Sequence, residues 1–278
     1  MSWLTSFFLE PLQYEVMQQA MLIAVLVCAT CAVLSCYLVL KGWSLMGDAV
    51  SHAVLPGIVL AYVAGLPLAI GAFAAGLFCA LATGFLKDNS RVKEDTVMGV
   101  VFSGLFALGI VLYTKVETDQ HLDHILFGNL LGVRPSEMIE MAITAVIVLA
   151  VVLIKRRDLL LYCFDPDHAR TINLPVKWLH YGLLILLSLT IVASIRAVGI
   201  ILVVAMLIAP GAIGYLVTSR FDKMLAIAVA SATISAVIGT LWSFQIDAAT
   251  GPAIILVQAA LFAVAFAISQ RRRSAPQA

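Results

Sequence analysis

Charged residues are scarce in this sequence. Only 12% of its 278 residues are Asp, Glu, Lys or Arg, whereas 62% are hydrophobic. A soluble domain of this length needs more polar residues to cover its surface, so the composition excludes a soluble globular protein. It indicates a chain that crosses a membrane several times. The formal net charge of +1 gives no general attraction to nucleic acid, and we expect no nucleic-acid partner.

Nucleotide-binding motifs are absent as well. The chain contains neither G-x-x-x-x-G-K-[ST] nor G-x-G-x-x-G, so it lacks the loops that hold nucleotide phosphates. If ATP drives its activity, another subunit must hydrolyse the nucleotide, and we do not expect this chain to be an enzyme. Residues 1–19 contain no Lys or Arg, so we expect no cleaved signal peptide.

The five cysteines do not indicate a disulfide framework. Four of them lie in apolar runs, and the last follows a basic segment. Cys28 and Cys31 have the spacing of a redox or metal pair. Their neighbours are apolar or small, however, and small residues are common where membrane helices pack, so we favour a packing role.

Long apolar runs predict an all-α, polytopic membrane protein that forms a single domain over residues 1–278. Each run can cross a hydrocarbon layer of about 30 Å as a helix of about 20 residues. The nine runs are residues 20–40, 45–64, 68–86, 96–114, 137–154, 179–195, 198–217, 224–244 and 252–269. An arrangement with eight spans, in which one segment is re-entrant, is the alternative.

Basic residues predict the orientation, because Lys and Arg concentrate in cytoplasmic loops. If Lys41 is cytoplasmic, almost all other Lys and Arg also fall on the cytoplasmic side. Only Lys115, Arg134 and Arg196 lie on the opposite side. We therefore expect an outside N-terminus and a cytoplasmic C-terminus.

The second apolar run contains an acid and a histidine, Asp48 and His52, which share one face of a helix because they are four residues apart. At about 1.5 Å per residue, they lie about 10 Å and 16 Å beyond Lys41. Ionisable residues at such depth usually face a bundle interior or a water-filled path. Carboxylate and imidazole together suit Mn(II), Fe(II) or Zn(II). The alternative is a structural hydrogen bond between helices.

Two Pro-Gly pairs follow inside predicted spans. Pro56-Gly57 comes directly after the Asp–His pair, and Pro210-Gly211 lies in the seventh run. Proline removes a helical hydrogen bond, so we expect each pair to interrupt or kink its helix. Transporters place substrate sites beside such interruptions at the membrane midplane.

An outer loop between the fourth and fifth runs contains two Asp and two His within six residues: Asp119, His121, Asp123 and His124. These residue types suit a metal-entry vestibule or a docking site for a metal-delivering partner. A solvated polar loop is the alternative, because loops are ordinarily polar and exposed.

An inner loop, at about residues 155–178, is the longest on the cytoplasmic side. Asp165 is a good helix N-cap and Pro166 suits the first helical position, while Pro175 ends a helix of about two turns. A short capped helix on this face is a natural contact for a soluble partner. A plain connecting helix is the alternative.

Three segments in order resemble one known family: GDAVSHAVLPG (47–57), KEDTVMG (93–99) and FDPDHA (164–169). They look like the permease subunits of bacterial ABC importers for manganese, zinc and iron. KDNSRVKED (87–95) and TDQHLDHILFGN (118–129) look most like the manganese/iron branch. The resemblance covers essentially the whole chain.

The resemblance implies a type II ABC-importer-like permease in the bacterial inner membrane. It implies a second permease copy or paralogue, two cytosolic ATP-binding subunits and an extracytoplasmic metal-binding protein. Asp48 and His52 would bind the transported Mn, Fe or Zn, and no cofactor would be bound permanently. The helix that enters the ATP-binding subunit would contain Asp165, Pro166, Asp167, His168, Ala169 and Arg170.

From these observations we expect ATP-driven import of a divalent metal by alternating access. Two alternatives remain open on the sequence. The first is a secondary metal-ion/proton transporter that also uses Asp48 and His52 but has no ATP-binding partner. The second is a membrane scaffold in which the pair is only structural.

Overall fold

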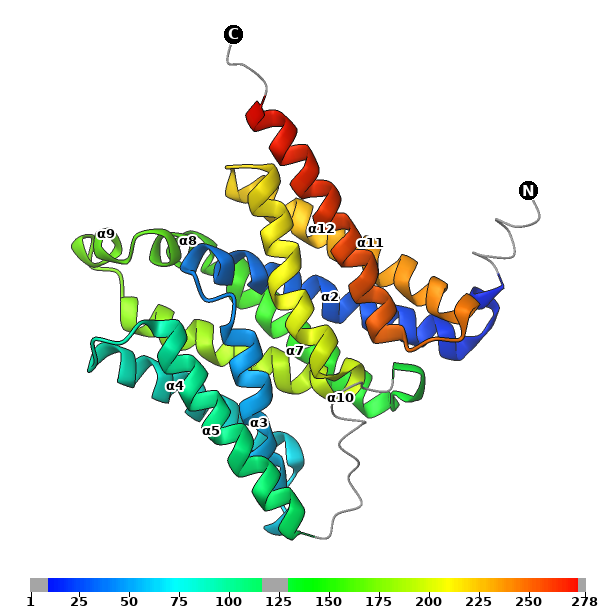
Figure 1. Cartoon of the computed structure of the whole chain (residues 1–278), viewed down its shortest axis with the longest axis horizontal. Helices are drawn as coiled ribbons and strands as arrows, with labels where there is room; N and C mark the ends of the chain where they lie inside the picture. The colour runs from blue at the N-terminus through cyan, green and yellow to red at the C-terminus, as the bar shows by residue number, and fades with distance from the viewer. Residues whose placement is uncertain (1–9, 117–129, 275–278) are drawn as a thin grey trace.

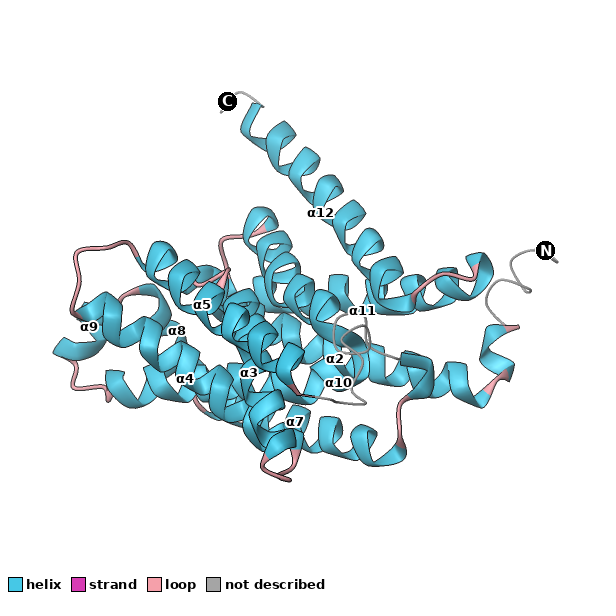
Figure 2. Cartoon of the chain, turned by 60° about the horizontal axis from the view of Figure 1, so that its bottom comes forward, coloured by secondary structure: helices cyan, strands magenta, loops and turns pink. Residues whose placement is uncertain are grey.

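The computed structural model describes residues 10–116 and 130–274, and Figure 1 shows them as a bundle of long helices. Within these ranges the chain contains helices and their connections but no strand (Figure 2). Nine helical segments of the described chain are long and apolar enough to cross a membrane. The predicted all-α, multi-pass architecture is confirmed, with nine spans rather than eight.

The helices occur in the following order. They are η1 (Pro11–Gln13), α2 (Glu15–Lys41), α3 (Met46–Val63), α4 (Leu68–Asp88), α5 (Glu94–Lys115), η2 (Leu130–Gly132), α7 (Pro135–Ile154), α8 (Arg156–Phe164), α9 (Pro166–Thr171), α10 (Val176–Val217), α11 (Phe221–Ile246) and α12 (Thr250–Ser274).

The centre of the bundle is α2, which packs against α10 and α11. In its most apolar stretch 72% of the residues are buried, against 17% for the span in α5. On one side α3 packs between α4, α5 and α10, and on the other side α12 packs on α10 and α11 (Figure 1). The outer helices therefore leave long apolar faces uncovered, as expected of a chain whose surface meets lipid or another membrane subunit.

Glycines allow the closest approach between helices. Gly57 of α3 and Gly71 of α4 face one another so closely that a Cβ on Gly57 would fall on the backbone oxygen of Gly71. Lipid tails are as apolar as the side chains, so association of membrane helices relies on this kind of close packing between small residues.

The predicted interruptions at Pro56 and Pro210 are wrong, because helical structure continues through both prolines, in α3 and in the part of α10 that follows Gly199. The break occurs instead at Gly199 inside α10, where φ is 79° and ψ is 165°. A residue with a side chain rarely adopts this conformation. A transmembrane helix tolerates a proline because it costs only one hydrogen bond, which neighbouring groups replace.

We expect Gly57→Ala to destabilise the helix pair α3–α4, because the added methyl group overlaps the backbone of Gly71. Overpacking of this kind costs roughly 1–3 kcal/mol. Thermal unfolding of the detergent-purified protein would show a lower Tm. Gly182→Ala is the matched control, since a Cβ at Gly182 meets no atom within 4 Å. Equal Tm values for the two variants would contradict this packing.

The predicted orientation can be tested with introduced cysteines, because the five native cysteines are all buried. Ala249 lies exposed in the connection between α11 and α12, and Lys93 lies exposed before α5. A membrane-impermeant maleimide should label Ala249→Cys in spheroplasts and should label Lys93→Cys only after permeabilisation. The reverse pattern would require the opposite orientation.

Candidate metal-binding site

Helix α3 places Asp48 and His52 on the same face, one turn apart. The distance between Oδ1 of Asp48 and Nε2 of His52 is 3.3 Å. Asp48 lies in the first turn of α3, where the partial positive charge of the helix N-terminus favours a carboxylate. The structure thus brings together the two residues that the sequence singled out.

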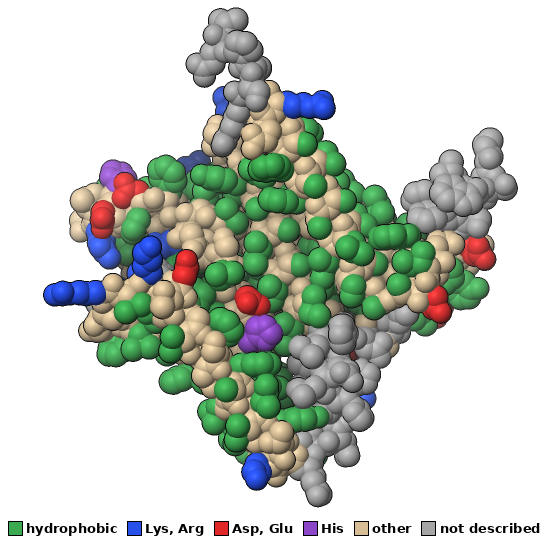
Figure 3. Space-filling view, in the orientation of Figure 1, with side chains coloured by type: hydrophobic (Ala, Val, Ile, Leu, Met, Phe, Trp, Pro, Cys, Tyr) green, Lys and Arg blue, Asp and Glu red, His purple; other side chains and the backbone are tan. Residues whose placement is uncertain are grey.

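This pair is only partly enclosed by its own chain. The exposed fraction is 34% for the side chain of Asp48 and 27% for that of His52. By contrast, the hydroxyls of Ser51 and Thr190 are buried and donate to backbone carbonyls of their own helices. Figure 3 shows an acidic and a histidine side chain side by side within a mainly apolar face. The pair is therefore accessible from outside the described chain.

The imidazole of His52 is held between two aromatic rings of α5. The ring of Phe102 is stacked at 6.1 Å between centroids, and that of Phe106 makes an edge contact at 5.1 Å. Nδ1 of His52 is buried and has no hydrogen-bond partner among the described residues. The ring is therefore positioned by packing, with Nε2 directed toward Asp48.

The geometry fits two ligands of one metal ion. With bonds of about 2.1 Å, neighbouring ligand atoms lie about 3.0 Å apart at an octahedral ion and about 3.4 Å apart at a tetrahedral one. The observed 3.3 Å lies between these values. Among the described residues, however, no group of three or more His, Cys, Asp or Glu could hold a metal. The described chain therefore offers two candidate ligands at this position rather than a complete site.

Sequence reasoning missed Phe102 and Phe106 as members of this site. Both are apolar residues in an apolar span, so nothing in the pattern distinguishes them. The outer-loop residues Asp119, His121, Asp123 and His124 lie outside the described residues, and their role stays a prediction.

The short inner-loop helix forms as α9, with its predicted cap. The side chain of Asp165 accepts a hydrogen bond from the backbone N–H of His168 at 2.9 Å, and Pro166 occupies the first turn. The helix has six residues and is thus shorter than the two turns expected, because the chain turns at Asn173, where φ is 58°.

One side of α9 is anchored and the other is presented to solvent. Ala169 is fully buried, whereas the side chains of Asp167 and Arg170 are 84% and 67% exposed and form an ion pair at 2.9 Å. This arrangement offers a rigid, polar surface of alternating charge.

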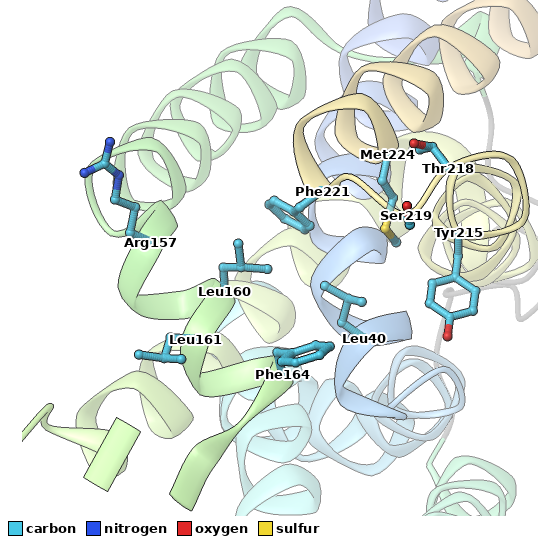
Figure 4. A pocket seen from close by; sticks show the side chains of 10 residues that line it. All are labelled: Leu40, Arg157, Leu160, Leu161, Phe164, Tyr215, Thr218, Ser219, Phe221 and Met224. Atoms are coloured by element: carbon cyan, nitrogen blue, oxygen red, sulfur yellow. The ribbon is translucent and has the colours of Figure 1, made fainter. Parts of the chain in front are cut away.

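An apolar groove of about 720 Å³ lies next to α8 (Figure 4). It runs between α8 and the connection from α10 to α11. Its lining comprises Leu40, Arg157, Leu160, Leu161, Phe164, Tyr215, Thr218, Ser219, Phe221 and Met224. Phe164 joins this groove to α9 and is 78% exposed. An apolar groove beside a polar helix is typical of a surface that another protein covers.

The cysteines take no part in a site. All five are free and buried. Burial raises the pKa of Cys163 in α8 to about 12, against a smaller opposing effect of Lys41. Its thiol therefore stays protonated at physiological pH, which disfavours reaction as a nucleophile.

Comparison with known proteins gives consistent matches along the whole chain. The model of the ABC 3 transport family matches residues 13–269. A probable iron transport system membrane protein of Haemophilus influenzae is 61% identical over 264 residues, covering 95% of this chain and 97% of the relative. The manganese transport system membrane protein MntB of Synechocystis is 51% identical over 256 residues, covering 92% and 84%.

A solved structure shows the same fold. PsaBC from Streptococcus pneumoniae, determined in complex with Fab, has a TM-score of 0.87 and is 35% identical, with 98% of each chain covered.

Proposed function

The chain belongs to the ABC 3 transport family and is a membrane permease of an ABC importer for divalent transition metal. We propose that the ion passes between the Asp48–His52 pairs of two permease chains. The observation that carries the proposal is the incomplete site: a carboxylate and an imidazole 3.3 Å apart, deep in a span, and open toward the outside of the chain.

A second permease chain would complete the coordination. Two carboxylates neutralise the charge of a divalent cation, and two imidazoles add nitrogen ligands. Four such ligands with no thiolate suit Mn(II) and Fe(II), whereas Cu(I) prefers sulfur. The names of the relatives, which refer to iron and manganese, support these two ions. Zn(II) accepts the same ligands and is the third candidate.

The permease would not form a permanent complex with its ion. Alternating access requires that the site release the metal to the cytoplasm, and a site assembled from two chains weakens when the chains separate. The break at Gly199 gives α10 two segments that can change their relative angle. No covalent chemistry is required of this chain, since its work is binding and gating.

Energy would come from ATP-binding subunits at the cytoplasmic face. We assign their contact to the loop at about residues 155–178, where α9 and the groove next to α8 form one continuous surface. Because the family is one of ABC transporters, it favours this ATP-driven mechanism over the secondary transporter. The proposal also places the N-terminus outside the cytoplasm. It includes an extracytoplasmic metal-binding protein that delivers the ion.

Substitution of the pair should abolish transport. We expect Asp48→Ala and His52→Ala to lower the uptake of radiolabelled Mn(II) at least roughly tenfold, since each removes a ligand. Uptake is measured in cells that also express the ATP-binding and metal-binding partners, with Fe(II) and Zn(II) as competitors. Ser51→Ala is the control, because Ser51 lies between Asp48 and His52 in the sequence, whereas its hydroxyl donates only to the backbone carbonyl of Gly47 in the same helix. Near-normal uptake in both variants, at equal abundance, would refute the site.

The surface of α9 should be needed for coupling rather than for metal binding. Asp167→Lys reverses an exposed charge and breaks its ion pair with Arg170, but leaves the buried Ala169 in place. We expect the ATP-binding subunit to co-purify poorly with this variant and uptake to fall in proportion. Asp95→Lys makes the same change at an exposed position on the same side of the membrane. If both variants behave alike, α9 has no special role.

A further inference from the structure

A second pocket, of about 550 Å³, lies at the cytoplasmic end of the bundle, away from the metal path. It is bounded by the connection from α2 to α3, the end of α4, α8 with α9, and the start of α10. Four basic residues line it: Lys41, Lys87, Arg170 and Lys177. No Asp or Glu is among the described residues of the lining. In Figure 3, charged side chains of both signs, Lys and Arg among them, lie at the left edge, where α9 and the end of α4 lie (Figure 1). We refer to this cavity as the basic pocket.

The wall of the basic pocket is aromatic and rigid. The hydroxyl of Tyr162 and Nδ1 of His180 are 2.8 Å apart, and the rings of Trp43 and His180 make an edge contact at 5.2 Å. The ammonium of Lys41 lies 4.3 Å from the ring centroid of Tyr162, so its position is fixed by a cation–π contact. The positive charge is therefore held in place rather than free to move away.

The wall also holds a donor without an acceptor. Trp43 is only 2% exposed, and its indole N–H has no hydrogen-bond partner among the described residues. A buried donor of this kind is costly unless a ligand or water accepts from it. Arg170 is paired with Asp167, and the lining itself combines four basic side chains with no described Asp or Glu. Both observations indicate an anion.

The rim of the basic pocket carries exposed apolar residues that would contact lipid. Leu81 and Phe85 of α4 line the pocket and are 39% and 68% exposed. Trp178, in the first turn of α10, is 80% exposed. Exposed aromatic residues at the end of a span mark the interface between hydrocarbon and water. The pocket thus presents positive charge at the depth of phosphate groups and apolar contact at the depth of acyl chains.

We propose that the basic pocket binds the phosphate head group of an anionic phospholipid from the cytoplasmic leaflet. Basic pockets between membrane helices on this side are suited to such head groups, and the volume lies in the range of small-molecule sites. The apolar rim distinguishes a lipid from free phosphate, which has nothing to place there. Pro166 and Arg170 of α9 also line the pocket, so the lipid would hold α9 at the membrane surface.

The test is native mass spectrometry of the permease, purified with its partner subunits in detergent and titrated with short-chain phosphatidylglycerol. We expect Lys87→Ala/Lys177→Ala to weaken binding roughly 30-fold, since each basic residue near such a charge contributes roughly fivefold. The control is Arg220→Ala/Lys223→Ala, which removes two exposed charges from the same side but outside the lining. It should bind as the unaltered chain does.

Each remaining outcome is decisive. Equal binding of zwitterionic phosphatidylethanolamine, or equal loss in both double variants, would overturn the proposal. Inorganic phosphate that displaces the lipid at equal concentration would identify a free-anion site instead. Loss of the ATP-binding subunit from Lys87→Ala/Lys177→Ala, with lipid binding intact, would make the pocket part of the protein contact. The experiment involves neither Asp48 nor His52, so failure here leaves the transport proposal untouched.

Discussion

The need to satisfy every backbone N–H and C=O without water governs this structure. In hydrocarbon an unpaired backbone group costs several kcal/mol. A helix avoids this cost because it pairs its backbone N–H and C=O groups within one segment. The described chain accordingly consists of helices. Because apolar side chains gain nothing by leaving lipid for one another, the helices are joined by close contact at small residues such as Gly57 and Gly71.

The same constraint distinguishes structural polar groups from functional ones. The hydroxyl of Thr190 is buried and donates to a carbonyl of its own helix, and Gln258 of α12 bonds to serines of α11. Each of these groups is satisfied within the chain. Asp48 and His52 contact one another, but Nδ1 of His52 has no partner among the described residues and the pair remains open on one side. This partial exposure, together with the metal-binding chemistry of the two side chains, is the reason that we propose them as the site.

Much of this arrangement could be predicted from the sequence, because span length and hydropathy depend on local composition. The nine spans and the shared face of Asp48 and His52 follow from local spacing alone. The position of the helix break could not be predicted, since proline is the visible signal and Gly199 is one glycine among 18. From the sequence alone, His180 is expected to be an ordinary interfacial residue. In the structure it contacts Tyr162 and Trp43. Tertiary contacts between distant segments leave no local pattern.

Pro56 has a further consequence for the backbone of α3. Without an N–H at this position, the backbone carbonyl of His52 lacks its usual partner one turn along α3. A chain that has not yet met its partner exposes that weakened turn together with a carboxylate, and a charge at the centre of a bilayer costs about 3 kcal/mol. Pairing of two chains around an ion would remove this cost. The residues that we propose as ligands of the cargo would then also favour the assembled permease over the single chain.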